Sequence, residues 1–290
     1  MKIIILIPVY NDWKSVSKLL EDINSNISGL DCNFSIIIVN DASTEETSII
    51  NSNLEKIRSI KIINIKENRG HTRCIATGLK HIFEKEEFDY VIPMDGDGED
   101  RPEEIKNFIG KIKINPEKTV VGERVKRSEG LFFEICYNIH KVLTFTFAGK
   151  NIKFGNYPCL TKSTVEKMIN DKASWSSFSG SLAKVENNKS STPSIRGERY
   201  FGPSKMSFKN LILHSLSIIS VFKISVLLRS ILFLAIYMFL VNDKLTIIML
   251  IPVVLIIFLI FLVLSISKRE NLNEINNSFS NILKIDTIKP

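Results

Sequence analysis

The residues best suited to chemistry form one acidic run, Asp95–Asp100, which reads D-G-D-G-E-D. Carboxylates this close repel one another, so a fold that gathers them at a strand end needs a compensating positive charge. Carboxylate oxygens are the ligands that hard divalent cations prefer. The run therefore predicts a divalent-metal site, and a metal bound there could hold a diphosphate.

A calcium loop and a plain turn are the other interpretations of this run. A helix–loop–helix calcium loop needs Gly at its sixth position and Glu at its twelfth, where this chain has Asp100 and Lys106. This mismatch excludes the calcium loop. A solvated turn remains an alternative, because Asp and Gly are ordinary turn residues. The choice between a turn and a metal site depends on the surrounding sequence.

Strand-like apolar runs alternate with helical patterns over the first ~125 residues. We expect strands at Lys2–Ile7, Phe34–Val39, Ile60–Ile65, Phe88–Met94 and from Val120, and helices at Val16–Ile23, Thr44–Ile57, Cys74–Phe83 and Glu103–Ile114. The alternation predicts an α/β fold with a doubly wound, mostly parallel sheet. In such sheets ligands bind beyond the carboxyl ends of the strands.

Polar residues follow three of these strands, at Pro8–Asp12, Asn40–Ser43 and the acidic run. Neither G-x-G-x-x-G nor a P-loop lysine occurs at these turns, so nucleotide phosphates would have to be bound by metal and by cationic side chains. Two of the polar groups have structural alternatives. Asp41 could simply cap the next helix, and Asn68–Gly70 could be only a turn before a helix.

Two apolar runs near the C-terminus predict a membrane hairpin. Leu245–Ile266 has no charged residue, and as a helix it would span about 33 Å at ~1.5 Å per residue, enough for a bilayer core. Ile224–Val241 carries only Arg229 as a charge, and this side chain would snorkel to the interface. A buried helical hairpin in a soluble core is the alternative.

Basic residues outside the hairpin predict its orientation. Lys223 precedes it and Lys268 follows it, so both outer ends are expected on the cytoplasmic side of a multi-pass protein of the cytoplasmic membrane. The expected divisions are a catalytic domain at 1–205, an interfacial amphipathic helix at 206–223, two transmembrane helices at 224–266 and a cytoplasmic tail at 267–290.

The charge distribution and the cysteines narrow the range of partners. The net charge is +7, and Arg196–Arg229 is rich in Lys and Arg. Beside a membrane hairpin, this charge favours anionic lipid headgroups over nucleic acid. The four cysteines and four histidines lack the spacing of zinc ligands.

Six motifs in order give this chain a family resemblance over its first ~210 residues, and they are specific together although each is weak alone. The motifs are I-P-V-Y-N at 7–11, V-N-D-A-S at 39–43, N-R-G at 68–70, M-D-G-D-G-E-D-R-P-E at 94–103, G-E-R at 122–124 and R-Y-F-G-P-S-K at 199–205. The chain resembles glycosyltransferase family 2, and within it the dolichyl- or polyprenyl-phosphate sugar synthases. The resemblance implies a glycosyltransferase A-type nucleotide-sugar fold.

The resemblance also implies a role for each matched position. The nucleotide-binding positions are Pro8, Tyr10, Asn11, Val39, Asp41, Asp95 and Gly96. Asp97 and Glu99 would hold Mg²⁺ or Mn²⁺, and the phosphates of donor and acceptor would be bound by Arg124, Arg199 and Lys205. The chemistry agrees, because Arg binds phosphate oxygens bidentately and Lys supplies a point charge. Asp97 and the three cations form the catalytic set.

This sequence departs from the family pattern at three places. Glu99 stands where the family has Gln, and Asn40 stands where V-D-D-G-S has its first Asp. The segment G-N-Y-P-C-L at 155–160 matches the family's G-D-F-R-L without its Asp and Arg. The last departure leaves the handling of the acceptor open.

The resemblance favours a membrane-anchored inverting glycosyltransferase. It would move a sugar from a UDP- or GDP-sugar to polyprenyl phosphate on the cytoplasmic leaflet. A hydroxyl of a glycan or lipid-linked acceptor is the alternative; it would need a general base, for which Glu186 is the candidate. A non-catalytic membrane scaffold is a further alternative. The motifs do not specify the sugar, the base, the polyprenol length or whether the chain forms a homo-oligomer.

Overall fold

The computed structural model of the chain describes residues 1–46, 54–126, 136, 138–139, 141–203, 207–242 and 246–289. The chain divides into two compact units. The first consists of Met1–Ser128, Lys153–Lys205 and Asn271–Pro290, and the second of Glu129–Ile152 and Met206–Glu270. The chain therefore returns to the first unit at its C-terminal end.

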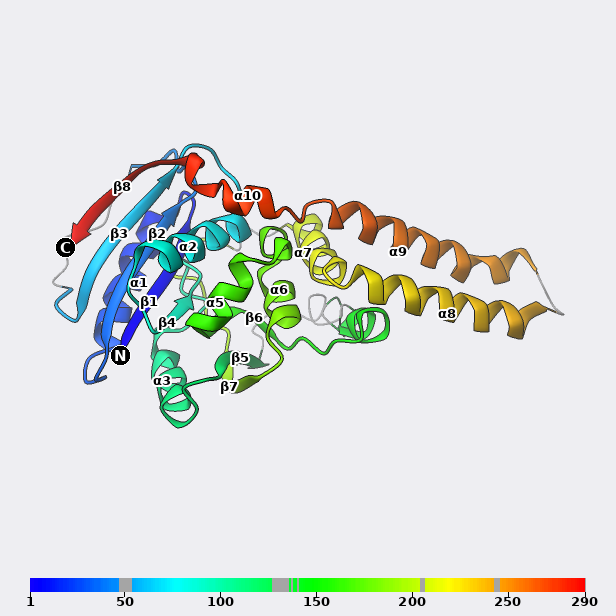
Figure 1. Cartoon of the computed structure of the whole chain (residues 1–290), viewed down its shortest axis with the longest axis horizontal. Coiled ribbons are helices and arrows are strands. Elements are labelled where there is room, and N and C mark those ends of the chain that lie inside the picture. Colours follow the sequence, from blue (N-terminus) through cyan, green and yellow to red (C-terminus); the bar gives the residue numbers. More distant parts are fainter. Residues whose placement is uncertain are drawn as a thin grey trace. The chain divides into compact units, whose positions relative to one another are not determined.

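The first unit is built on a mixed sheet with the strand order β7-β5-β6-β4-β1-β2-β3-β8 (Figure 1). The strands are β1 (Lys2–Val9), β2 (Asn33–Asn40), β3 (Ile57–Ile65), β4 (Tyr90–Pro93), β5 (Thr119–Lys126), β6 (Phe154–Thr161), β7 (Lys189–Ile195) and β8 (Ile282–Lys289). β1 pairs in parallel with β2 and β4, β2 with β3, and β5 with β7. β6 and β8 join their neighbours antiparallel. The expected α/β fold is confirmed.

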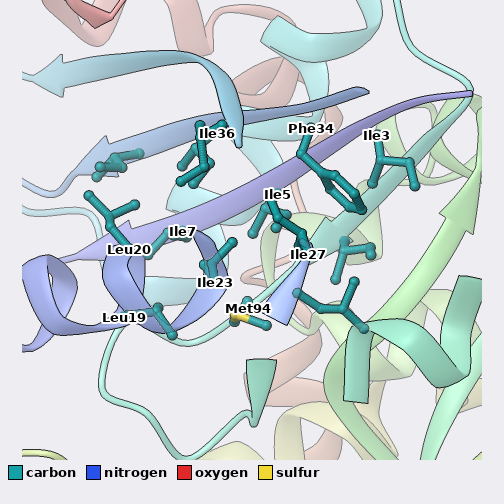
Figure 2. Close-up of a cluster of buried hydrophobic side chains, with 14 of the residues drawn as sticks. Ile3, Ile5, Ile7, Leu19, Leu20, Ile23, Ile27, Phe34, Ile36 and Met94 are labelled. Atoms are coloured by element: carbon teal, nitrogen blue, oxygen red, sulfur yellow. The ribbon is translucent and has the colours of Figure 1, made fainter. Parts of the chain in front are cut away.

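Helices cover both faces of this sheet, because successive side chains of a strand point to opposite faces. In β1, Ile5 and Ile7 pack with one core cluster and Ile4 and Leu6 with the other. The first cluster includes side chains of α1 (Trp13–Asn26) and α3 (Ile105–Ile114), and the second those of α2 (His71–Lys85), α5 (Lys162–Ile169) and α6 (Phe178–Val185). Figure 2 shows the α1 side of the first cluster lying against β1.

One expected helix, Thr44–Ile57, differs from the structure. Residues 44–46 and 54–56 are not helical, and Ile57 begins β3. Residues 47–53 lie outside the described part of the chain. The apolar spacing that suggested the helix includes the start of β3, where Ile57 is buried in the sheet core rather than on a helix face.

The C-terminal segment, expected to be a tail, carries an edge strand. β8 runs antiparallel to β3, with Asp286 opposite Ile62 and Lys284 opposite Asn64. Its apolar residues do not alternate regularly, and Leu283 and Ile285 are exposed. Sequence periodicity alone therefore gave no strand signal here, whereas pairing with β3 supplies the backbone hydrogen bonds.

The second unit contains the apolar segments. α7 (Phe208–Ser220) precedes α8 (Lys223–Val241), and η5 (Ile247–Leu250) leads into α9 (Ile251–Ser267). Two helical segments, Lys223–Val241 and Ile247–Asn276, are long and apolar enough to cross a membrane, and only 11% of the most apolar window of each is buried. Such exposed apolar surface does not fit helices of a soluble core.

Arg229 is held by backbone groups within the second unit. Its Nη1 donates to the carbonyl oxygen of Thr146 at 3.2 Å, and Gly149 packs so closely that an added Cβ would lie 2.6 Å from Nη2. Thr146 belongs to η2 (Thr144–Ala148), a short π-helical segment. The arginine in α8 therefore has a protein acceptor, where snorkelling alone was expected.

Candidate active site

The three polar strand ends meet at one edge of the sheet. β1, β2 and β4 are parallel neighbours, with Val9 opposite Asn40 and Leu6 opposite Pro93. Their carboxyl ends therefore lie side by side, and the loops that follow them approach one another. This edge carries the candidate active site.

The loops after β1 and β2 are fastened together by Asn11. Its backbone N–H donates to Ser43 Oγ at 3.0 Å, and its Oδ1 accepts the N–H of Thr44 at 2.8 Å. Asn11 and Ala42 both have left-handed backbone conformations, with φ of 48° and 55°. Two non-glycine residues in this region mark a loop whose shape is set by its surroundings.

Asp41 holds the turn that starts α2. Its Oδ1 accepts the N–H of Arg69 at 2.7 Å and its Oδ2 accepts that of Gly70 at 2.9 Å. Asp41 is 3% exposed. Asp41 therefore fixes the turn before α2 without capping the helix itself, whose start has no side-chain cap hydrogen bond, and it joins the second motif of the resemblance to the third. Each carboxylate oxygen can accept a further bond.

The acidic run lies beyond β4 and is partly buried. His71 Nε2 and Asp95 Oδ1 are 2.8 Å apart, and Asp100 Oδ2 accepts the N–H of Asp95 at 3.0 Å. Burial and the neighbouring Asp95 raise the pKa values of Asp97 and Asp100. For Asp95 itself, burial would raise the pKa, but the charge and hydrogen bond of His71 outweigh it and hold that pKa low.

Two arginines from the segment after β7 compensate the acidic run. Arg199 donates from Nη1 to Asp97 Oδ2 at 2.5 Å and from Nη2 to Asp12 Oδ2 at 2.6 Å. Arg196 pairs with Glu99. The backbone follows the same path, because the N–H of Tyr200 donates to the carbonyl oxygen of Asp97 at 2.9 Å. The expected metal ligands thus have cationic partners.

Arg124 approaches the acidic run from β5. Its positive charge lowers the pKa values of Asp95 and Asp100, against the larger effect of burial. It packs over Gly155 in β6, where an added Cβ would lie 2.9 Å from Arg124 Nη2. Gly155 therefore provides the room in which this guanidinium lies. Lys205, the remaining expected phosphate ligand, lies outside the described residues.

The other expected nucleotide-binding residues differ in access. Tyr10 is 45% exposed at the site edge, while the side chain of Val39 is fully buried in the core cluster beside α2. Pro8 is also buried. Gly96 packs closely, since an added Cβ would lie 3.1 Å from Val16 Cγ2. Any contact from Val39 to a base would therefore use its backbone.

The sequence profile of Glycosyl transferase family 2 matches residues 4–173. The chain belongs to this family. The match covers β1 to η3 (Lys172–Trp175) and so includes the loops after β1, β2 and β4.

Curated relatives agree with this family. The chain is 27% identical over 218 residues to undecaprenyl-phosphate 4-deoxy-4-formamido-L-arabinose transferases of Salmonella choleraesuis and Salmonella paratyphi B. Each match covers 73% of this chain and 64% of the relative, so the chain matches less than two thirds of their length.

The solved structures show the fold. Staphylococcus aureus TarS 1-349 in complex with UDP-GlcNAc has a TM-score of 0.52 at 15% identity, covering 79% of this chain and 70% of that one. Glucosyl-3-phosphoglycerate synthase from Mycobacterium tuberculosis, in complex with Mn²⁺, UDP-glucose and phosphoglyceric acid, has a TM-score of 0.53 at 12% identity, covering 78% and 79%.

In this family 2 chain, Glu186, the candidate base for a hydroxyl acceptor, lies at the opposite end of the parallel strands from the acidic run. It lines a cavity with Met1, Phe88 and Tyr90, which lie at the amino ends of β1 and β4. Its Oε2 accepts from Lys167 Nζ at 2.9 Å and from Thr164 Oγ1 at 3.1 Å. The expectation that Glu186 could serve as base is wrong, because the acidic run follows the carboxyl end of β4.

Three residues near the acidic run had no site role assigned from the sequence. They are Asp12, His71 and Arg196, which contact Arg199, Asp95 and Glu99 respectively. Asp12 and His71 adjoin the I-P-V-Y-N and N-R-G motifs of this family 2 chain, so motif adjacency could have indicated them. Arg196 had been attributed to lipid binding, and only the path of the chain after β7 brings it to Glu99.

Proposed function

We propose that the chain is a membrane-anchored inverting glycosyltransferase that moves a sugar from a UDP- or GDP-sugar to polyprenyl phosphate. The observation that carries the proposal is the meeting of Arg124, Arg196 and Arg199 with the acidic run at the carboxyl edge of the sheet. Arginine side chains gathered beside carboxylates can bind the phosphate groups of a donor and an acceptor. The names of the Salmonella relatives support polyprenyl phosphate as the acceptor.

A divalent cation, Mg²⁺ or Mn²⁺, fits the acidic run. In the part of the chain that the structure describes, no three His, Cys, Asp or Glu side chains are grouped as metal ligands. Burial and the neighbouring Asp95 nevertheless raise the pKa values of Asp97 and Asp100, and a bound cation would offset the repulsion among these carboxylates. Asp97 and Glu99 would hold the ion, and when bound it would stabilise the charge on the leaving nucleotide.

The residues of this chain would bind and orient both substrates. The loops held by Asn11 and Asp41 would receive the nucleoside of the donor, with Tyr10 against the base. Arg124, Arg199 and Lys205 would bind the phosphates of donor and acceptor. A phosphate nucleophile is already ionised at neutral pH, so no general base is required. The position of Glu186 away from this edge supports a phosphate over a hydroxyl acceptor.

The anchoring proposed here is a hairpin with both termini in the cytoplasm. β1 and β8 belong to one sheet, which supports a common side for the two ends of the chain. The catalytic part would then be 1–205 together with the C-terminal strand, rather than 1–205 alone. α7 would lie in the interface plane as an amphipathic helix, and 224–266 would cross the membrane twice.

A panel of labelled nucleotide sugars tests the proposal. The full chain in detergent is incubated with each UDP- or GDP-sugar and polyprenyl phosphate, and labelled lipid is extracted. We expect label in the lipid with at least one donor. A parallel set with neutral polyprenol and glycan acceptors tests the hydroxyl alternative, and absence of transfer with every pair would favour the scaffold.

A further inference from the structure

A chain of polar side chains joins the C-terminal strand to the loop after β2. Asn64 Nδ2 donates to Asp286 Oδ2 at 2.9 Å, and Asn40 Nδ2 donates to Asn64 Oδ1 at 2.8 Å. Asn40 and Asn64 are each 8% exposed. Buried amides need partners, so this arrangement constrains both asparagines. Lys284 also pairs with Asp286 at 3.0 Å.

The carboxylate of Asp286 sets the donor–acceptor direction of every hydrogen bond in this series. An ionised Asp can only accept hydrogen bonds, so Asn64 must turn its NH₂ group toward Asp286. The Oδ1 of Asn64 then faces Asn40, which must donate. This leaves Asn40 Oδ1 directed at the next loop, where it accepts the N–H of Ser43 at 3.0 Å.

The same series of hydrogen bonds continues into the loop after β1. Ser43 Oγ accepts the N–H of Asn11 at 3.0 Å, and Asn11 directly follows Tyr10. The shape of this pair of loops is not held by regular secondary structure, because Asn11 and Ala42 are left-handed. Besides the backbone hydrogen bond from the N–H of Asp41 to the carbonyl oxygen of Val9 at 2.8 Å, side-chain hydrogen bonds hold the two loops together.

We propose that Asp286 is a positioning residue for the donor site, acting through Asn64 and Asn40 on the loops that receive the nucleoside. This rests on the proposed function for the role of those loops. It gives β8 a part in donor binding, although β8 lies at the edge of the sheet and far along the chain. It also accounts for Asn40, because an Asp at that position could not donate to Asn64 while Asp286 holds the amide in its present direction.

Reversing the chain of hydrogen bonds tests this directly. Asn40→Asp should oppose two acceptors and raise the donor KM about tenfold, equivalent to about 1.4 kcal/mol, with kcat changed less than twofold. Asp286→Asn should raise the donor KM less than Asn40→Asp does, because its amide oxygen can still accept from Asn64 but no longer fixes the direction of that amide. In the double variant the direction can reverse: the new amide at position 286 donates to Asn64, and Asn64 donates to the new carboxylate at position 40. The donor KM should then return to within about threefold of the parent.

Amide hydrogen exchange in residues 41–46 of the full chain measures the change in loop hydrogen bonding without substrate. We expect faster exchange at Ser43 in Asn40→Asp, a smaller increase in Asp286→Asn, and restored protection in the double variant. No rescue in the double variant by either measurement would overturn the positioning role. If protection is restored in the double variant but the protein uses no nucleotide sugar, the coupling between Asp286 and the loops stands and the proposed function is rejected.

Discussion

Replacing Arg199 removes the side chain that joins the acidic run to the start of α1. Its guanidinium donates to Asp97 at 2.5 Å and to Asp12 at 2.6 Å, and its side chain is 12% exposed. Hydrogen bonds to charged groups contribute roughly 1.5–3 kcal/mol each. The two carboxylates are 18% and 20% exposed, so solvent takes over part of that loss. We therefore expect Arg199→Ala to lower the free energy of unfolding of the first unit by about 2–4 kcal/mol.

Arg199→Lys should lose about half as much, because an ammonium group cannot form the fork that reaches both carboxylates. Arg58→Ala, an exposed arginine on β3, is the matched control and should change stability by less than about 0.5 kcal/mol. Denaturant unfolding followed by tryptophan fluorescence measures all three variants. A loss below about 0.5 kcal/mol for Arg199→Ala would refute the bridge as a contributor to stability.

Three further predictions follow from the site and the membrane unit. Ala42→Gly should stabilise the protein by about 0.5–1 kcal/mol in thermal unfolding, because glycine removes left-handed strain of about 1–2 kcal/mol at some entropic cost; a lower melting temperature would count against it. Gly155→Ala should reduce transfer by displacing Arg124, whereas the control Gly110→Ala, with open space around it, should not; equal activities would contradict this. Reporter fusions at Lys2 and Pro290 should both report the cytoplasm, and opposite sides would show that one apolar helix does not span.

The sheet and its faces could be predicted from the sequence because their signals are local. β1 shows a continuous apolar run, and the spacing of Leu19, Leu20 and Ile23 matches the buried face of α1. The carboxyl-edge loops follow from the same alternation. For these elements the pattern of a few neighbouring residues determines which side faces the core.

The missed features depend on partners far along the chain. Asn64 and Asp286 are separated by 222 positions, and β8 has no regular alternation of its own. The pairing of Arg196 with Glu99 and the location of Glu186 at the opposite edge likewise depend on topology. Motif order could place residues in a family, but it could not show which edge of the sheet a later segment reaches.

The central claim is tested most directly by comparing the parent with Asp97→Asn in a transfer assay. Each protein is incubated with the active labelled nucleotide sugar and polyprenyl phosphate, with and without excess chelator, and labelled lipid is measured. Asn keeps the size of Asp97 but removes its charge. We predict that the parent forms labelled lipid, that chelator abolishes it and Mg²⁺ or Mn²⁺ restores it, and that Asp97→Asn forms none while still folding. Full transfer by a folded Asp97→Asn protein, or by the parent in excess chelator, would contradict a metal-dependent active site at the acidic run.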